Sequence, residues 1–399
     1  MSLKYNKPEF FVSMYIFAQY KNHPMKKIQM VDLVSQYEKI QEDVDQSVLE
    51  VIRSSAYING PEVKNFQKEL EEYLKVKHVI PCANGTDALQ MAMMALGLKP
   101  GDEVITATFT FVATAEVIAL LGLTPVLVDV DPDTFMLDPQ EVEKAITPKT
   151  KAIVPVHLFG QCADMEAIMK IAKEHNLFVI EDTAQAIGAD YTFADGTTAK
   201  AGTMGDIGTT SFFPSKNLGC FGDGGAIFTQ NDEYAEKLRV IANHGMTVRY
   251  YHDEIGVNSR LDSIQAAILR KKLPHLDTYN ASRKRAADFY SDAFAASDKI
   301  KTPAKVKGST HVFHQYTLKL EDVDRAELIE HLNRKGIPAM IYYPVPLHMQ
   351  KAYQDDRYTE GQFPVAEMLA SQVISLPMHS ELDDEQLTFI TESFLEFVN

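Results

Sequence analysis

One aspartate and one lysine in this chain have the types and surroundings that one kind of covalent chemistry needs. Asp182 ends an apolar run, residues 177–182, that predicts a buried strand, and Lys216 lies 34 positions later on a turn before a Gly-rich segment. A lysine amine forms a Schiff base with an aldehyde, and an aspartate keeps a pyridinium nitrogen protonated. Pyridoxal phosphate (PLP) needs both groups. Either residue alone is more often an ordinary charge, but their order and surroundings predict a PLP site.

A segment near residue 85 suits the phosphate of such a cofactor. Gly85 permits a close backbone approach, Thr86 supplies a hydroxyl, and the helix predicted to follow presents free N–H groups at its positive end. The same Gly-Thr-Asp sequence is also a good helix N-cap, so the segment alone is a weak signal. In the run 108–114 an aromatic side chain could stack on a flat ring, although we expect Phe109 to belong to the core.

An alternation of strands and helices must position these residues. Apolar strands that alternate with helices predict an α/β fold with a mainly parallel sheet covered on both faces. Predicted strands cover residues 103–108, 124–130, 151–157, 178–182, 209–213 and 226–229. Predicted helices cover residues 31–55, 62–74, 111–121, 139–146, 165–174, 233–244 and 261–276.

The last third of the chain predicts a smaller unit. A long helix near residues 281–296 leads away from the sheet, and the pattern after it predicts a strand, a helix, a strand and a helix over 314–320, 325–335, 339–343 and 384–397. We therefore predict a large domain with N-terminal helices over 27–280 and a small α+β domain over 281–399. Residues 1–26 are predicted to be an N-terminal extension outside both domains.

The composition excludes several classes of protein. A formal net charge of −16 argues against a nucleic-acid surface, and no apolar run approaches the roughly 18 residues that span a bilayer. The cysteines, Cys82, Cys162 and Cys220, are too few and too scattered for a disulfide framework, which favours the reducing cytoplasm. Neither membrane nor nucleic acid is therefore an expected partner.

Four motifs, in order, resemble the DegT/DnrJ/EryC1/StrS family of nucleotide-sugar aminotransferases. They are residues 83–89, 181–185, 211–216 and 256–262. The resemblance extends from about residue 27 to the C-terminus. It implies a fold-type I PLP enzyme, similar to aspartate aminotransferase, with a seven-stranded sheet in its large domain. It also implies a homodimer whose active sites lie at the subunit interface.

The family pattern assigns roles to individual residues of this chain. Lys216 becomes the Schiff-base lysine, which argues for transamination because a branch of the family that removes sugar oxygen carries histidine there. Asp182 becomes the pyridinium partner, and Asn258 reaches the phosphate bound to the second subunit. The other implied cofactor contacts are Gly85, Thr86 and Ser211 at the phosphate, Phe111 at the stacking position and Gln185 near the ring face.

Further segments most resemble the subgroup that aminates UDP-2-acetamido-3-oxo-glucuronate with glutamate, which leaves as 2-oxoglutarate. These segments are residues 159–164, 219–225, 244–252, 256–262 and 343–348. Arg260 is a candidate for the uronate carboxylate, and an ion pair with Asp262 or Glu254 is the alternative. His314 and Tyr316 are candidates for the substrate pocket.

Four other interpretations stay open. The first is that the segment around His311 is an ordinary exposed edge strand; His311 and His314 alone do not predict a metal site, since no third ligand is near them in the sequence. The second is that the chain is a PLP aminotransferase for a 4-keto-6-deoxy nucleotide sugar, because enzymes for the 3-keto and the 4-keto sugars share every cofactor motif. A protein of this fold could also be a catalytically silent regulatory partner. A dinucleotide enzyme is weakly suggested by the glycines at 222–225, which do not form a G-x-G-x-x-G motif.

Overall fold

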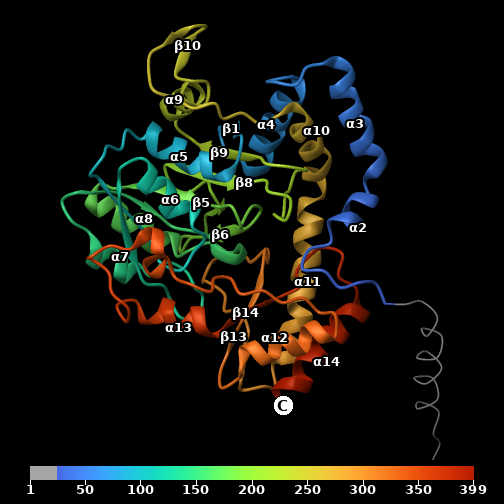
Figure 1. Cartoon of the computed structure of the whole chain (residues 1–399). Coiled ribbons are helices and arrows are strands. Elements are labelled where there is room, and N and C mark those ends of the chain that lie inside the picture. The colour runs from blue at the N-terminus through green and yellow to red at the C-terminus, as the bar shows by residue number, and fades with distance from the viewer. Residues whose placement is uncertain (1–24) are drawn as a thin grey trace, which may run out of the picture.

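The computed structural model describes residues 25–399, and its centre is a sheet of seven strands (Figure 1). The spatial order is β1–β9–β8–β5–β4–β2–β3, in which β9 alone runs against its neighbours. The predicted mainly parallel sheet is confirmed. The strands are β1 (His78–Cys82), β2 (Glu103–Ala107), β3 (Thr124–Val128), β4 (Thr150–Val154), β5 (Phe178–Asp182), β8 (Ile207–Ser211) and β9 (Gly225–Thr229).

Helices cover both faces of this sheet. In β4, Ile153 packs into one core cluster, and its neighbours Ala152 and Val154 pack into another, because successive strand side chains point to opposite faces. The first cluster includes residues of α7 and α8, and the second includes residues of α5, α6 and α9. These helices are α5 (Gly85–Ala95), α6 (Ala113–Leu120), α7 (Pro139–Ala145), α8 (Met165–His175) and α9 (Asp232–Ala242).

The N-terminal helices pack beside the sheet on α10 (Ser263–Lys272). The single helix predicted over 31–55 is wrong, because two helices, α2 (Leu33–Glu38) and α3 (Gln41–Ser54), replace it and α4 (Pro61–Leu74) follows. Ile40 lies at the break with the non-helical angles φ −128° and ψ 16°. The break allows Ile40 to pack with Val44 and with Ile268 of α10.

The C-terminal part has its own core around a three-stranded antiparallel sheet. Phe294, Tyr316 and Phe394 are fully buried there. The helix α11 (Leu276–Phe294) crosses residue 281, and the domain boundary at that residue stays a prediction. The remaining elements here are β12 (Ile300–Lys301), β13 (Tyr316–Leu320), β14 (Val373–Leu376), α12 (Arg325–Arg334), α13 (Pro364–Gln372) and α14 (Asp384–Val398).

The strand predicted over 339–343 is wrong. Only Met340 pairs with a strand residue, in an isolated bridge to Ser375 of β14. The segment then leaves the sheet, so that Tyr342 and Tyr343 reach a cavity described below. The third strand of the small sheet is instead β14, whose four buried residues the sequence pattern did not reveal.

Two hairpins and several single turns complete the fold. The hairpin of β10 and β11 projects from the body at the top of Figure 1. No helix within residues 25–399 is both long and apolar enough to cross a membrane. Of the predicted N-terminal extension, residues 1–24 lie outside the described part. The remaining elements are β6 (Asp190–Thr192), β7 (Thr198–Lys200), β10 (Met246–Val248), β11 (Tyr251–His252) and the 3-10 turns η1 (Leu158–Gly160), η2 (Leu273–His275), η3 (Leu347–Met349) and η4 (Lys351–Tyr353).

Candidate active site

A cavity of about 710 Å³ lies where β5 and β8 end, beside the first turns of α5 and α6. The carboxyl ends of parallel strands are the usual place for ligands in sheets of this kind. The cavity brings together eight residues that the sequence predicted as site residues, although they span more than 200 positions. They are Gly85, Thr86, Phe111, Asp182, Gln185, Ser211, Lys216 and His314.

Asp182 is the last residue of β5, and 6% of its surface is exposed. One carboxylate oxygen accepts a hydrogen bond from the Thr114 hydroxyl at 2.8 Å, and the other accepts one from the Ala184 N–H at 3.2 Å. The carboxylate therefore has a fixed orientation at the wall of the cavity. A group held this way can pair with a ring nitrogen.

Lys216 lies on the turn after β8, where its side chain is half-buried. Burial lowers the pKa of the Lys216 amine to about 8, although the negative charge of Asp182 acts in the opposite direction. Within residues 25–399 the amine has no hydrogen-bond partner. An amine with this pKa is unprotonated in an appreciable fraction of molecules near neutral pH, which suits a nucleophile or a base.

One end of the cavity is built for an anion. The helix α5 begins at Gly85, and the N-cap residue Asn84 accepts a hydrogen bond from the Asp87 N–H at 2.8 Å. A Cβ atom added at Gly85 would lie 2.8 Å from the Cβ of Ser211, so only glycine allows these two segments to approach so closely. The helix N-terminus and the hydroxyls of Thr86 and Ser211 together suit a phosphate.

The Gln185 side chain has a defined orientation. Its amide oxygen accepts a hydrogen bond from the Phe159 N–H at 2.7 Å, and its amide nitrogen donates to the Tyr343 hydroxyl at 3.1 Å. Phe111 lines the same cavity with a ring 53% exposed, and its centroid lies 6.2 Å from that of Tyr343. An aromatic face and an amide are thus both available to a flat ring in this cavity. Phe109 is 1% exposed and belongs to the core, as predicted.

His314 also lines the cavity and is 5% exposed. Burial, and then the positive charges of Lys216 and Arg283, lower the pKa of His314 well below its usual range. Its Nδ1 atom is buried without a partner among the described residues. His314 is therefore a neutral imidazole with an unused hydrogen-bonding atom at the site.

Three predicted residues do not line this cavity. Asn258 is exposed, and Arg260 is half-buried; no salt bridge within residues 25–399 joins Arg260 to Asp262 or Glu254. The expectation for Tyr316 needs correction. Its ring is fully buried 4.9 Å from that of Tyr290, and its hydroxyl bonds to that of Ser291 at 2.9 Å. Tyr316 belongs to the core of the C-terminal part, because it begins β13 facing α11.

The sequence did not single out Thr114 or Tyr343. Thr114 lies within the run 108–114 of hydroxyl and aromatic residues, but no local pattern indicates which hydroxyl meets Asp182. Tyr343 ends the segment wrongly predicted to be a strand. Both reach the site from remote segments, so their roles depend on tertiary packing.

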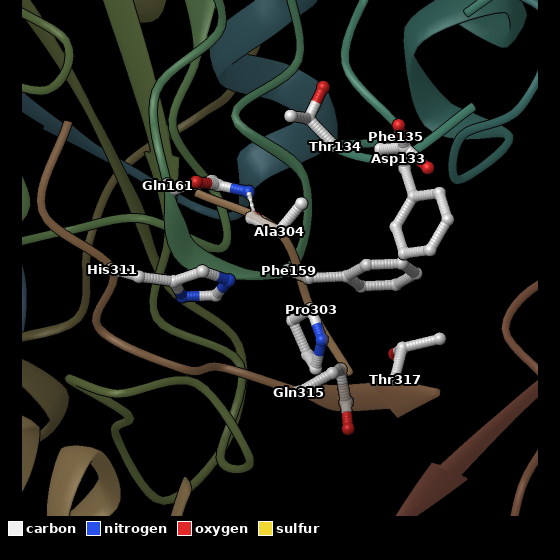
Figure 2. Close-up of a pocket in the computed structure, with 10 residues that line it drawn as sticks. All are labelled: Asp133, Thr134, Phe135, Phe159, Gln161, Pro303, Ala304, His311, Gln315 and Thr317. Atoms are coloured by element: carbon white, nitrogen blue, oxygen red, sulfur yellow. Dashed lines mark hydrogen bonds between the residues drawn. The ribbon is translucent and has the colours of Figure 1, made fainter. Parts of the chain in front are cut away.

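A second, smaller cavity of about 10 Å³ shares Gln315 with the large one (Figure 2). This volume admits about one water molecule and excludes a substrate. His311 lies at its edge with 8% of its surface exposed, and its ring stacks on Phe313 with 3.9 Å between centroids. The expectation that His311 belongs to an exposed edge strand is therefore wrong. Burial lowers the pKa of His311 to about 3.

Comparison with known protein families identifies the family of this chain. The model of the DegT/DnrJ/EryC1/StrS aminotransferase family matches residues 38–395. The chain belongs to this family. A Geobacillus stearothermophilus protein named "Pleiotropic regulatory protein" is 50% identical over 93% of this chain and 98% of its own length. The UDP-2-acetamido-2-deoxy-3-oxo-D-glucuronate aminotransferase of Pseudomonas aeruginosa is 46% identical over 91% of this chain and 98% of its own.

Solved structures agree with this assignment. A DegT/DnrJ/EryC1/StrS aminotransferase from Brucella abortus has a TM-score of 0.88 and 42% identity, and the match covers 93% of this chain and 100% of that one. Among the curated relatives, six that are 35–46% identical have names that state the position of an oxo or amino group, and each name includes carbon 3.

The family resemblance inferred from four motifs is thus confirmed. The chain is a PLP-dependent aminotransferase of fold type I, and the dinucleotide alternative is excluded. The cavity fits the cofactor, because it combines a lysine amine, an oriented carboxylate, an aromatic face and the close approach of Gly85 to Ser211. Lys216 and Asp182 would hold opposite ends of its ring system, and α5 would hold its phosphate.

Proposed function

We propose that this enzyme transfers an amino group from glutamate to UDP-2-acetamido-3-oxo-glucuronate in the cytoplasm. The product is a 2-acetamido-3-amino uronate, a precursor of bacterial surface polysaccharides such as the O-antigen of lipopolysaccharide. The observation that carries the proposal is the single cavity that holds both Lys216 and Asp182. The choice of sugar is supported by the name of the Pseudomonas relative and by the recurrence of carbon 3 among six relatives.

The residues of this chain divide the chemistry among them. Bound PLP supplies an electrophilic carbon for amine exchange and a protonated ring that delocalises the electrons of a broken C–H bond. The Lys216 amine removes the proton from the α-carbon of glutamate, for which a pKa of about 8 is well suited. Asp182 keeps the ring nitrogen protonated. When 2-oxoglutarate has left and the ketosugar is bound, Lys216 moves a proton in the opposite direction.

The proposed substrate carries a carboxylate that needs a cation. Arg260 can bind it through two parallel hydrogen bonds, and the alternative ion pairs with Asp262 or Glu254 do not form in the described chain. Arg260 and Asn258 lie outside the cavity of their own chain. We therefore propose that they serve the active site of a second subunit.

Exposed apolar surface supports a homodimer. The β10–β11 region exposes Val248, Tyr250, Tyr251 and Ile255, each by 59% or more. A second apolar groove between α2, α3 and α10 includes Leu33, Val34 and Phe221. Contiguous apolar surface of this kind marks interaction sites more often than free surface. Sedimentation equilibrium at micromolar concentration should give twice the mass of the chain, and a monomer would refute the shared site.

Complementation of two inactive variants tests the shared site directly. Lys216→Ala and Arg260→Ala proteins are unfolded together, refolded as a mixture and assayed with the uronate substrate. If Arg260 serves the second subunit, half of the dimers are mixed, and one of the two sites in each is fully native. About a quarter of the wild-type activity should then return, as the symmetry of a two-fold dimer requires. If Arg260 serves its own subunit, the mixture stays as inactive as its components.

The substrate is tested by comparing two ketosugars. With glutamate as donor, the 3-oxo-uronate should be aminated with a kcat/KM at least about 100-fold above that of a 4-keto-6-deoxy nucleotide sugar, because the sugar without a carboxylate leaves the Arg260 guanidinium without its partner. The reverse preference would replace the proposed sugar with the second candidate.

A regulatory role is favoured only by the names of two relatives, a "Pleiotropic regulatory protein" and an "Erythromycin biosynthesis sensory transduction protein". An unchanged visible spectrum of the PLP-bound protein after glutamate is added would support that role and refute this proposal.

A further inference from the structure

Thr114 occupies an unusual position for a helical threonine. It is the second residue of α6, its side chain is completely buried, and its hydroxyl donates to Asp182 at 2.8 Å. A buried threonine further along a helix can return its hydroxyl to a carbonyl one turn earlier, whereas Thr114 lies in the first turn of α6 and has no helical carbonyl one turn before it. Thr391 in α14 returns its hydroxyl in this way, since it donates to the carbonyls of Leu387 and Thr388 at 3.0 Å. Thr114 instead reaches a side chain 68 positions away.

The contact determines how the Asp182 carboxylate lies. An ionised carboxylate only accepts hydrogen bonds, so the Thr114 hydroxyl must be the donor. With Thr114 on one oxygen and the Ala184 N–H on the other, the plane of the carboxylate cannot rotate without losing a bond. A hydrogen bond to a charged group is also stronger than one between neutral groups. This bond therefore restrains the orientation of the carboxylate that would meet a ring nitrogen.

The same contact joins two walls of the cavity. Phe111 lies three residues before Thr114, just ahead of α6, and its exposed ring lines the cavity. Asp182 ends β5 on the other wall. The Thr114 hydroxyl thus ties the segment that carries the aromatic face to the strand that carries the carboxylate.

We propose that Thr114 is a positioning residue, whose hydroxyl holds the Asp182 carboxylate in the plane that pairs with the pyridine nitrogen of PLP. This inference rests on the role proposed for Asp182. According to this inference, the Thr114 side chain affects the affinity for PLP and the electronic state of the PLP ring, although it need not touch either substrate.

The test compares Thr114→Val, which keeps the shape and removes the hydroxyl, with Thr114→Ser, which keeps the hydroxyl. PLP is titrated into apoprotein and followed by absorbance. Thr114→Val should weaken binding by about tenfold or more, the effect expected for a lost bond to a charged acceptor. Thr114→Ser should stay within about threefold of the wild type. The matched control is Thr391→Val, an equally helical and buried threonine, which should bind PLP like the wild type.

Two further measurements separate positioning from packing. In the Asp182→Ala background, which removes both carboxylate oxygens, Thr114→Val should weaken binding by less than about twofold, because the acceptor of its hydroxyl is gone. The pH at which the visible band of bound PLP titrates should shift in Thr114→Val and not in Thr114→Ser. Equal losses in both Thr114 variants, or wild-type affinity in Thr114→Val, would overturn the inference.

A Thr114→Val protein that fails to fold is replaced by Thr114→Ala, judged by the same criteria. An Asp182→Asn protein with wild-type affinity and spectrum would instead refute the role proposed for Asp182.

Discussion

Two lysines in this protein, the half-buried Lys216 and the fully buried Lys272, have amines of similar pKa in different surroundings. Burial lowers the pKa of both Lys216 and Lys272 to about 8. Lys272, in α10, is 1% exposed and donates to the Gly219 carbonyl at 2.6 Å, with its amine 5.5 Å from the centre of the Phe221 ring. Lys216 has no such partner in the described chain and faces a cavity of about 710 Å³.

The comparison shows that a lowered pKa does not by itself identify a reactive amine. Desolvation disfavours the charged form wherever a lysine is buried. Lys272 uses its donor to fix the loop that follows Lys216, and no substrate can reach it. Lys216 combines the same pKa with open space and a carboxylate, Asp182, on the cavity wall. Access and an unused hydrogen-bonding group therefore separate the reactive lysine from the structural one.

The largest expected difference between the two lysines is in turnover. Lys216→Ala should lower kcat by about 1,000-fold or more, because it removes both the covalent anchor and the base. Lys272→Met should keep kcat within about tenfold of the wild type. Steady-state assays with glutamate and the 3-oxo-uronate measure both values. Near-full activity in Lys216→Ala would refute its role as covalent anchor and base. Equal losses of kcat in both variants would refute the distinction between a reactive and a structural lysine.

The second expected difference is in the pH dependence of the rate. The base must be unprotonated, and burial lowers the pKa of the free Lys216 amine to about 8, so the single-turnover rate with glutamate should rise from pH 6 and level off at higher pH. Lys272→Met should show the same profile, since Lys272 does not take part in proton transfer. Stopped-flow absorbance between pH 6 and 9.5 provides the measurement. If the pH–rate profile of Lys272→Met were displaced by a full pH unit, the ionisation of Lys216 would depend on Lys272, and the contrast between the two lysines would be wrong.

The smallest expected effect is on stability, and it belongs to Lys272. Its pKa is about 8 in the folded state and near the usual 10.5 in the unfolded state, so between these values the unfolded chain binds more protons. The free energy of unfolding of the wild type, relative to Lys272→Met, should therefore rise with pH by about 1 kcal/mol per unit from pH 8 to 9.5. Below pH 8 the difference should be constant.

Urea denaturation of both apoproteins at one fixed protein concentration measures this difference. Curves that stay parallel through pH 9.5 would show that Lys272 keeps an ordinary pKa in the folded protein.

Much of the fold could be predicted because its determinants are local. β5 begins and ends at the predicted residues. Four helices each differ from their predicted bounds by one residue at one end only: α4, α7, α8 and α12. Prediction failed where distant packing decides the backbone. Ile40 breaks the first helix to pack on α10, and the segment after Met340 leaves the sheet for the cavity.

The candidate site shows the same division. Lys216, Asp182 and Gly85 follow strands or precede a helix, so a sequence pattern places them at one edge of the sheet. His314 and Tyr316 are two positions apart and looked equivalent, yet His314 lines the cavity and Tyr316 is enclosed by α11. No local pattern separates them, because which side chain is covered depends on elements elsewhere in the chain.

By itself, the sequence determined the kind of chemistry and the order of the elements that carry it. Residue type sets what a lysine or a carboxylate can do, and periodicity over a few neighbours sets strand and helix. Only the tertiary structure decided that Thr114 and Tyr343 reach the site, that Arg260 lies outside its own cavity, and that Lys216 and Lys272 differ in access. These properties arise from desolvation and from contacts between remote segments, which exist only after the chain has folded.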